Sequence, residues 1–173
     1  MPLRERGKIR TAHSWFRVLL CVPAVLASAV ALSATLPGQV SRIVDGDRIV
    51  VTSQGNDYRI RLGGLDAPEL NQPWGVAAAQ TLRRRLAGRF VVVDWSGTDR
   101  SQYRTGVVRL NGEDQNLYML DQGLAWYDPR YRIPQDEAGR RRYAAAEHEA
   151  REAGRGLWSD RDPMPPWDWR RMR

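Results

Sequence analysis

The stretch from Val40 to Asp66 constrains the fold most strongly, because strand signals and turn signals alternate along it. Residues 49–52 are all β-branched, and Gln54-Gly55-Asn56-Asp57 after them is typical of a hairpin turn. Residues 58–62 alternate apolar and basic side chains with the period of a β-strand. Gly63-Gly64 then indicates a bend or bulge at a barrel corner. The stretch therefore predicts three consecutive strands.

One helix, two strands and two further helices are expected after these strands. The segments are a helix over about 74–87, strands over about 90–94 and 105–110, and helices over about 115–122 and 136–153. The apolar stripes expected on the long helices are Val76, Ala79, Leu82 and Leu86 on the first, and Tyr143, Ala146, Ala150 and Ala153 on the last. Short strands with one helix inserted before the fourth predict an α+β fold. The expected architecture is a five-stranded Greek-key barrel of the OB type with about three α-helices.

Residues 1–34 are typical of an export signal. A basic start precedes an apolar run from Val18 to Ala34, and small residues near its end offer cleavage sites. The run is longer than a common signal core but shorter than the ~20 apolar residues that span a bilayer. The small residues at its end favour a cleaved signal over an uncleaved anchor. We therefore expect a secreted or periplasmic protein, with a membrane-anchored protein facing outward as the alternative.

Two further segments complete the expected organisation. Pro37-Gly38 has the composition of a linker, so residues 35–160 are expected to form the barrel domain. Residues 161–173 form a tail rich in Pro, Trp and Arg, expected to pack on the surface or to fray. The formal net charge is +7, of which residues 1–34 carry +4, so about +3 remains for the domain. Bulk charge alone therefore does not establish nucleic-acid binding.

Cysteine and histidine are almost missing from the expected domain. Cys21 is the only cysteine and lies in the export segment, which excludes disulfides and thiolate metal sites in the rest of the chain. His148 is the only histidine after residue 34, so metal sites built from several histidines are excluded as well. We expect His148 to face solvent on the last helix.

Two carboxylate clusters flank the second and third predicted strands. They are Asp45-Gly46-Asp47 and Asp66-Ala67-Pro68-Glu69. An antiparallel strand pair would bring Asp47 and Asp66 together, and converging carboxylates bind hard cations such as Ca²⁺ or Mg²⁺. Either cluster alone would be read as a turn or a strand end. Arg61 lies on the polar face of the strand leading to Asp66, and a metal beside a guanidinium is a phosphate site. Glu69 can orient or deprotonate a water.

Several motifs in the same order resemble the staphylococcal nuclease (thermonuclease) family, from Val40 to about Trp169. They are Ile43 to Asp47, Arg59 to Leu62, Leu65 to Glu69, Gln72 to Gly75, Asp99 to Arg104, Asn116, Gly123 to Trp126, Tyr143 to Arg151, and Gly156 to Trp158. The resemblance implies an OB barrel with packed helices, acting on DNA and RNA and leaving 3′-phosphate ends. Nothing in the sequence demands an obligate protein partner, so a monomer acting on a DNA or RNA substrate is expected.

The resemblance also implies roles for individual residues. Asp47 and Asp66 would bind Ca²⁺, with Mg²⁺ less favoured, and Ala67 would contribute its backbone carbonyl. Glu69 would position or activate the attacking water. Arg61 and Arg104 would hold the scissile phosphate and stabilise the transition state. Tyr131 falls where the family has an aromatic residue at the nucleotide pocket.

The sequence departs from the family pattern at two places. Arg48 stands where the family commonly has threonine, and this added cation would either weaken Ca²⁺ binding or point outward. The segment before Arg104 is one residue longer than usual and has Tyr103 in place of glycine. Arg100 is therefore a second candidate for the phosphate-binding role.

Two alternatives to an active exported nuclease remain open. The first is a catalytically silent nucleic-acid-binding module on the same barrel, for which the carboxylates Asp47, Asp66 and Glu69 would not be needed. The second is an envelope-anchored interaction domain without a nucleic-acid role. Stabilisation by Ca²⁺ would argue against the second, because only a protein with a metal site is stabilised by mass action.

Overall fold

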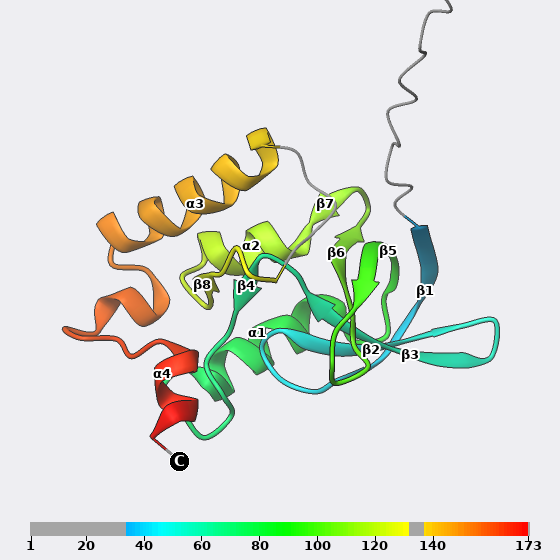
Figure 1. Cartoon of the computed structure of the whole chain (residues 1–173), viewed down its shortest axis with the longest axis horizontal. Coiled ribbons are helices and arrows are strands. Elements are labelled where there is room, and N and C mark those ends of the chain that lie inside the picture. The colour runs from blue at the N-terminus through cyan, green and yellow to red at the C-terminus, as the bar shows by residue number, and fades with distance from the viewer. Residues whose placement is uncertain (1–33, 132–136, 173) are drawn as a thin grey trace, which may run out of the picture. The chain divides into compact units, whose positions relative to one another are not determined.

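Five strands close into a barrel, as the sequence predicts (Figure 1). The computed structural model describes residues 34–131 and 137–172, so the expected export signal lies outside the described residues except for Ala34. The barrel strands are β1 (Ala34–Ile43), β2 (Arg48–Ser53), β3 (Asn56–Leu62), β5 (Phe90–Thr98) and β6 (Arg104–Leu110). Antiparallel pairs give the order β3-β2-β1-β5-β6, and a parallel pairing of β3 with β6 closes the barrel.

Two tight turns connect neighbouring strands in the way their sequences predict. Gln54 and Gly55 join β2 to β3 with φ angles of 50° and 78°. Asn111 and Gly112 join β6 to β7 (Glu113–Asp114) with φ angles of 53° and 84°. Two consecutive positive φ values define the hairpin turn whose twist matches that of paired strands. These turns set the register of the strand pairs that they connect.

Pro37 and Gly38 lie inside β1, so their interpretation as a linker is wrong. The first half of β1 pairs with β5 and the second half with β2, with a register shift between Val40 and Arg42. Pro37 is in the half that has no β2 partner, where a missing N–H is tolerated. At Gly38 an added Cβ would lie 2.6 Å from the carbonyl oxygen of Thr52. Glycine therefore allows β1 to curl closely past β2.

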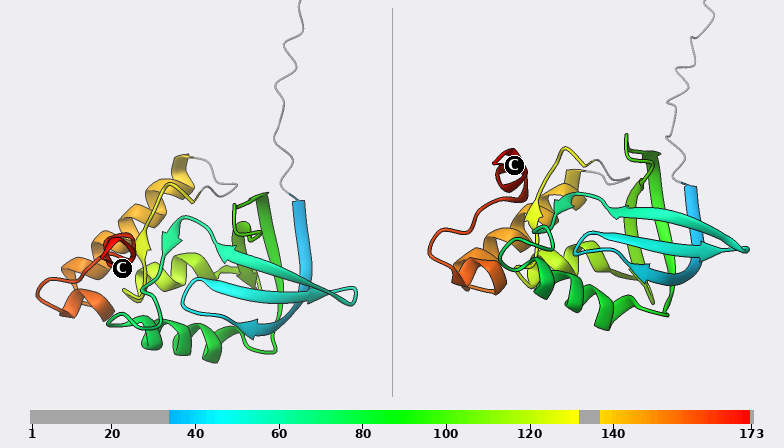
Figure 2. Two further views of the ribbon diagram at one scale, coloured as in Figure 1. Left: turned by 60° about the horizontal axis from the view of Figure 1, so that its bottom comes forward. Right: turned by 90° about the horizontal axis from the view of Figure 1, so that it is seen from below.

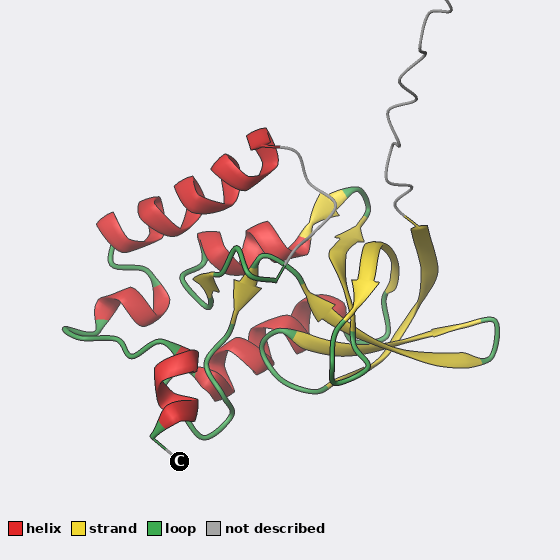
Figure 3. Ribbon diagram, in the orientation of Figure 1, coloured by secondary structure: helices red, strands yellow, loops and turns green. Residues whose placement is uncertain are grey.

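Three helices occupy the segments predicted for them, and Figure 3 shows α2 beside the barrel strands and α3 on the side of α2 away from the barrel. They are α1 (Gly75–Leu86), α2 (Gln115–Asp121) and α3 (Glu137–Glu152). The stripe residues Val76 on α1 and Ala153 after α3 were assigned wrongly, because both are exposed. Ala78 is buried in place of Val76, next to the stripe residues Ala79, Leu82 and Leu86. His148 is exposed, as expected.

The C-terminal tail forms ordered structure, which the sequence did not predict. It contains the short helix α4 (Pro166–Arg171), and the 3₁₀ turn η1 (Gly156–Ser159) comes just before it, within the expected barrel domain. Trp126, in the short strand β8 (Trp126–Tyr127), makes edge contacts with Trp158 and Trp167 at centroid distances of 4.3 and 5.8 Å. Trp167 thus packs the tail against the domain at Trp126. Figure 2 shows α4 close to the segment that leads into α1.

The hydrophobic core fills the barrel and continues between the barrel and the helices. Ile49, Ile60, Leu62 and Val93 are fully buried inside the barrel, and Tyr143 of α3 is buried against α2. Within the part of the chain that the structure describes, no helix is long and apolar enough to cross a membrane.

Candidate active site

The two carboxylate clusters meet because the loop that carries Asp45 and Asp47 packs closely against the end of β3 and against β4. Asp47 precedes β2, and its carbonyl accepts a hydrogen bond of 2.8 Å from the N–H of Leu62 at the end of β3. Asp66 belongs to β4 (Leu65–Asp66), which begins after the Gly63-Gly64 turn. At Gly46 an added Cβ would lie 2.7 Å from the Cβ of Ala67. The glycine therefore lets the Asp45–Asp47 loop lie directly on Ala67, beside Asp66.

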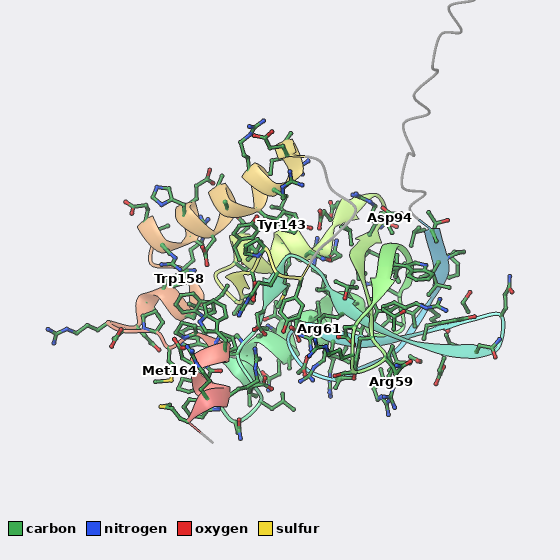
Figure 4. The ribbon with its side chains drawn as sticks, in the orientation of Figure 1. Arg59, Arg61, Asp94, Tyr143, Trp158 and Met164 are labelled. Atoms are coloured by element: carbon green, nitrogen blue, oxygen red, sulfur yellow. The ribbon has the colours of Figure 1, made fainter. Side chains whose placement is uncertain are left out.

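Arg61 joins the second aspartate of the loop to the rest of the site. Its Nη1 donates to Asp47 Oδ2 at 3.2 Å, and its guanidinium lies 4.6 Å from the ring centroid of Tyr131. Its Nε lies 3.3 Å from Asp99 Oδ2, an ion pair that lacks hydrogen-bond geometry. Figure 4 shows Arg61 near the middle of the molecule and Arg59 at its rim, which agrees with a buried Arg61 and an exposed Arg59.

The buried aspartates are held in a setting that disfavours their charged forms. Asp47 and Asp66 are only 3% and 1% exposed. Burial raises the pKa of Asp47 well above its usual value; Arg61 opposes this shift, and the nearby Asp45 and Asp66 add to it. Burial also raises the pKa of Asp66, against hydrogen bonds from Arg170. A positive charge placed between the two carboxylates would favour their ionised forms.

Tyr131 is half-buried beside this pair, where the sequence comparison with the family had placed an aromatic residue. Burial and the charge of Asp66 raise the pKa of its hydroxyl. Its carbonyl accepts a hydrogen bond of 2.6 Å from Gly64 N–H, which fixes the ring at the bend between β3 and β4.

Glu69 is positioned by Gln72, a residue to which the sequence analysis gave no role. The side-chain oxygen of Gln72 accepts a 3.1 Å hydrogen bond from the N–H of Glu69, and the N–H of Gln72 donates to the Glu69 carbonyl at 2.8 Å. Gln72 is buried. Gln72 belongs to one of the motifs shared with the family, which could have indicated a role for it. Only the fold shows that its side-chain amide closes the turn that carries Glu69.

Arg48 points into the site and not outward. Its guanidinium pairs with Asp45, lies 3.7 Å from Asp47 Oδ1 and 3.4 Å from Glu69 Oε2. Burial lowers the pKa of Arg48, but the hydrogen bond and charge of Asp45 outweigh burial and raise it above its ordinary value. Arg48 is therefore charged at every working pH and partly neutralises the carboxylates around it.

Arg104 and Arg100 are not brought into this group in the conformation described. The guanidinium of Arg104 lies between the rings of Tyr58 and Trp95, 4.3 and 4.4 Å from their centroids. In the parallel pairing of β3 with β6, Arg104 is opposite Ile60, and the Ile60 side chain is buried in the barrel. The residue opposite Arg61 is Thr105, so Arg104 is not the register partner of Arg61. Arg100 is exposed in the turn that Asp99 closes by accepting from Ser101 and Tyr103 N–H groups. The phosphate-binding role given to either residue stays a prediction.

Arg170 of α4 also belongs to the site, although no sequence pattern predicts a role for it. Its Nη2 and Nη1 donate to the two carboxylate oxygens of Asp66 at 2.6 and 3.2 Å, and Nη1 also donates to Glu69 Oε1 at 2.8 Å. The expectation that the tail frays or packs on the surface is therefore incomplete, because the tail reaches the carboxylates. A contact across 104 residues leaves no local pattern in the sequence.

The donor atoms fit a hard cation, although an arginine holds part of the set. Among residues 34–131 and 137–172, no three histidine, cysteine, aspartate or glutamate side chains are grouped to hold a metal ion. Asp47 and Asp66 supply buried carboxylate oxygens, the ligand type that Ca²⁺ and Mg²⁺ prefer. In this conformation Arg170 provides the positive charge at Asp66.

Comparisons with known proteins show which proteins this chain is similar to. The sequence model described as "Staphylococcal nuclease homologue" matches residues 59–160. A protein named micrococcal nuclease from Shigella flexneri is 37% identical over 161 residues, which cover 84% of this chain and 90% of that protein. A protein named uncharacterized endonuclease from Escherichia coli O157:H7 is 37% identical over 140 residues, covering 80% of this chain and 88% of that protein. Another of that name from Haemophilus influenzae is 34% identical over 135 residues, covering 78% and 72%.

Proposed function

This chain belongs to the staphylococcal nuclease family, and on that premise we propose that it hydrolyses phosphodiester bonds of DNA and RNA with the help of a divalent metal ion, calcium. Asp47 and Asp66 would hold the metal with their carboxylates, and Ala67 with its backbone carbonyl. When bound, such an ion neutralises charge on the phosphate and on the oxygen atoms that attack and leave.

The charge of the site is the observation that carries the proposal. Ion pairs link three arginines to five carboxylates, so that this network has a formal charge of −2. The arginines are Arg48, Arg61 and Arg170, and the carboxylates are Asp45, Asp47, Asp66, Glu69 and Asp99. An excess of negative charge around the buried carboxylates of Asp47 and Asp66 is costly unless a cation offsets it. A divalent ion would offset this excess.

Arg61 and Glu69 would act directly on the substrate. Arg61 carries a permanent charge on a buried, oriented guanidinium, which suits it to bind the scissile phosphate and stabilise the transition state. Glu69 is more exposed than the aspartates and is held by Gln72, so its carboxylate can orient or deprotonate a water. The turn at Glu69 thus places a base beside the metal ligands.

Digestion of single- and double-stranded DNA and of RNA by the purified chain tests this function. We expect cleavage with Ca²⁺, none after a chelator is added, and 3′-phosphate ends on the products. Asp66→Asn should reduce cleavage by at least about 10²-fold, the usual scale for loss of a key charged group. Asp162→Asn, at an exposed position outside the site, is the control and should retain full activity.

Other results would redirect the assignment. Salt-sensitive DNA binding without cleavage under any metal would favour a silent binding module on the same barrel. Cleavage that persists in Asp66→Asn would contradict the metal site.

We also propose that the protein acts outside the cytoplasm, on the basis of the basic and apolar pattern of residues 1–34. Fusing this segment to a reporter enzyme that is active only after export should give an active reporter. A reporter that stays inactive in the cytoplasm would contradict the proposal.

A further inference from the structure

Helix α4 brings a charged side chain to the site from outside the segment that the family model matches. That segment ends at residue 160, and α4 spans Pro166–Arg171. The guanidinium of Arg170 spans both oxygens of Asp66, and its Nη1 also reaches Glu69. Two N–H groups of a guanidinium can bind both oxygens of a carboxylate at once, so Arg170 binds the Asp66 carboxylate in a bidentate way.

The position of α4 does not depend on the Arg170 side chain. Gln72 Nε2 donates to the carbonyl of Met164 at 2.6 Å, and Trp169 Nε1 donates to Asn71 Oδ1 at 3.2 Å. Trp167 packs edge-on against Trp126, and the side chain of Pro166 is buried. Because these contacts hold the backbone in place, the Arg170 side chain can change position while α4 stays docked.

There is also space for the side chain to move. Arg170 and Trp169 line an open hollow of about 590 Å³ together with Asp45, Arg48 and Glu69. The side chain of Arg170 is 39% exposed on the rim of this hollow, whereas that of Asp66 is 1% exposed. A guanidinium released from Asp66 would therefore enter solvent and not the core.

We propose that Arg170 competes with the metal ion for Asp66 and Glu69, so that the ion binds only when this guanidinium leaves. The proposal rests on the proposed function, because it takes Asp66 as a metal ligand. Two positive charges cannot share the oxygens of one carboxylate without strong repulsion. Arg170 thus neutralises the buried aspartate in the metal-free protein and raises the metal concentration at which the nuclease works.

Calcium binding to the full chain, measured by titration calorimetry, tests this competition. Arg170→Gln removes the competitor and should tighten the calcium dissociation constant roughly tenfold, the scale of a charge-assisted contact. Arg170→Lys keeps the charge but cannot span both Asp66 oxygens, so it should also bind calcium more tightly than the wild type. Arg171→Gln is the matched control. Its side chain is 76% exposed and pairs with Asp168, and we expect unchanged affinity.

Thermal unfolding provides a second readout that a purely structural role would not move. In Arg170→Gln the metal-free protein should melt at a lower temperature, because Asp66 loses its counter-charge, and calcium should raise the melting temperature by more than in the wild type. A structural role alone would lower the melting temperature equally with and without calcium.

Each result separates this inference from the proposed function. Tighter calcium binding by Arg170→Gln without cleavage by any variant would support the competition and contradict the nuclease function. Calcium-dependent cleavage with an unchanged or weaker calcium affinity in Arg170→Gln would support the function and overturn the competition. If no form of the protein binds calcium, the competition is overturned.

Discussion

At the scale of single residues, the site depends on a glycine and on charges that must be balanced. Gly46 brings the Asp45–Asp47 loop into contact with Ala67, because a larger side chain would collide with Ala67 and Ala78. The Asp-Gly-Asp motif therefore has a steric reason as well as a chemical one. Asp45 and Asp99, which the sequence analysis left without a role, each pair with an arginine of the site.

The raised pKa of Asp47 predicts how pH affects the metal-free protein. The folded state binds this proton more tightly than the unfolded state, whose pKa stays near the usual 3.8. The free energy of unfolding should therefore fall as pH rises from about 4 through the raised pKa, because the folded protein must then bury a charge. Asp47→Asn should remove the part of this fall that Asp47 causes.

Urea unfolding in the presence of a chelator, between pH 4 and pH 8, measures this effect. Relative to the wild type, Asp47→Asn should be more stable at pH 8 than at pH 4. Asp162→Asn serves as the control, with no comparable pH-dependent difference expected. A difference between Asp47→Asn and the wild type that does not change with pH would contradict the assignment.

At the scale of elements, the closure of the barrel is coupled to α2 through one amide side chain. Asn116 is fully buried, and its Nδ2 donates to the carbonyls of Gly63 and Gly106, each at 2.9 Å. Its Oδ1 accepts from Val108 N–H at 3.0 Å. The side chain thus joins the end of β3 to β6 where these two strands pair in parallel. The same contact holds the Gly63-Gly64 bend that leads to Asp66.

Replacing Asn116 with alanine should destabilise the whole domain. The change removes the side-chain partner of the Gly63 carbonyl and of the Val108 N–H, whereas the Gly106 carbonyl still accepts from Gly63 N–H. We expect a cost of about 2–4 kcal/mol in unfolding free energy. Asn56→Ala in the exposed β2–β3 hairpin is the control and should change stability by less than ~0.5 kcal/mol. Denaturant titration compares the two. An Asn116→Ala variant as stable as the control would show that other groups or water satisfy these atoms.

At the scale of the whole molecule, three segments far apart in sequence meet at the site. They are the start of β2, the turn after β4 and α4: Glu69 of the turn contacts both Arg48 and Arg170. The tail returns through the tryptophan cluster around Trp126. The carboxylate site and the C-terminal helix are therefore parts of one structure, and a ligand at the site should stabilise the fold as a whole.

Calcium should raise the stability of the wild-type chain by mass action. At a free concentration one hundred times the dissociation constant, the gain is about 2.7 kcal/mol for a single site. The gain should disappear in Asp66→Asn, which loses a carboxylate ligand, and should remain in Asp162→Asn. Melting temperatures with calcium and with chelator measure it. An equal gain in Asp66→Asn would assign the stabilising ion to another place on the protein.

Local patterns were sufficient to predict most of the fold. Strand alternation over residues 58–62, the hairpin turns and the helical segments depend on neighbouring residues, so they can be read along the chain. The errors at Val76 and Ala153 concern which face of a helix is buried, and that depends on the partner that covers it. Pro37-Gly38 was misjudged for a related reason, since its strand exists only because β5 pairs with it.

The sequence indicated which kinds of side chain form the site, and the tertiary structure decided where several of them lie. The residue types at Asp47, Asp66, Arg61 and Glu69 were enough to predict a phosphate site with carboxylate ligands, because such chemistry needs few kinds of side chain. Only the folded chain decided that Arg48 points inward, that Arg104 lies between two aromatic rings, and that Arg170 covers Asp66. Charges attract in any direction, so the partner of each arginine depends on distances in space that spacing along the chain does not contain.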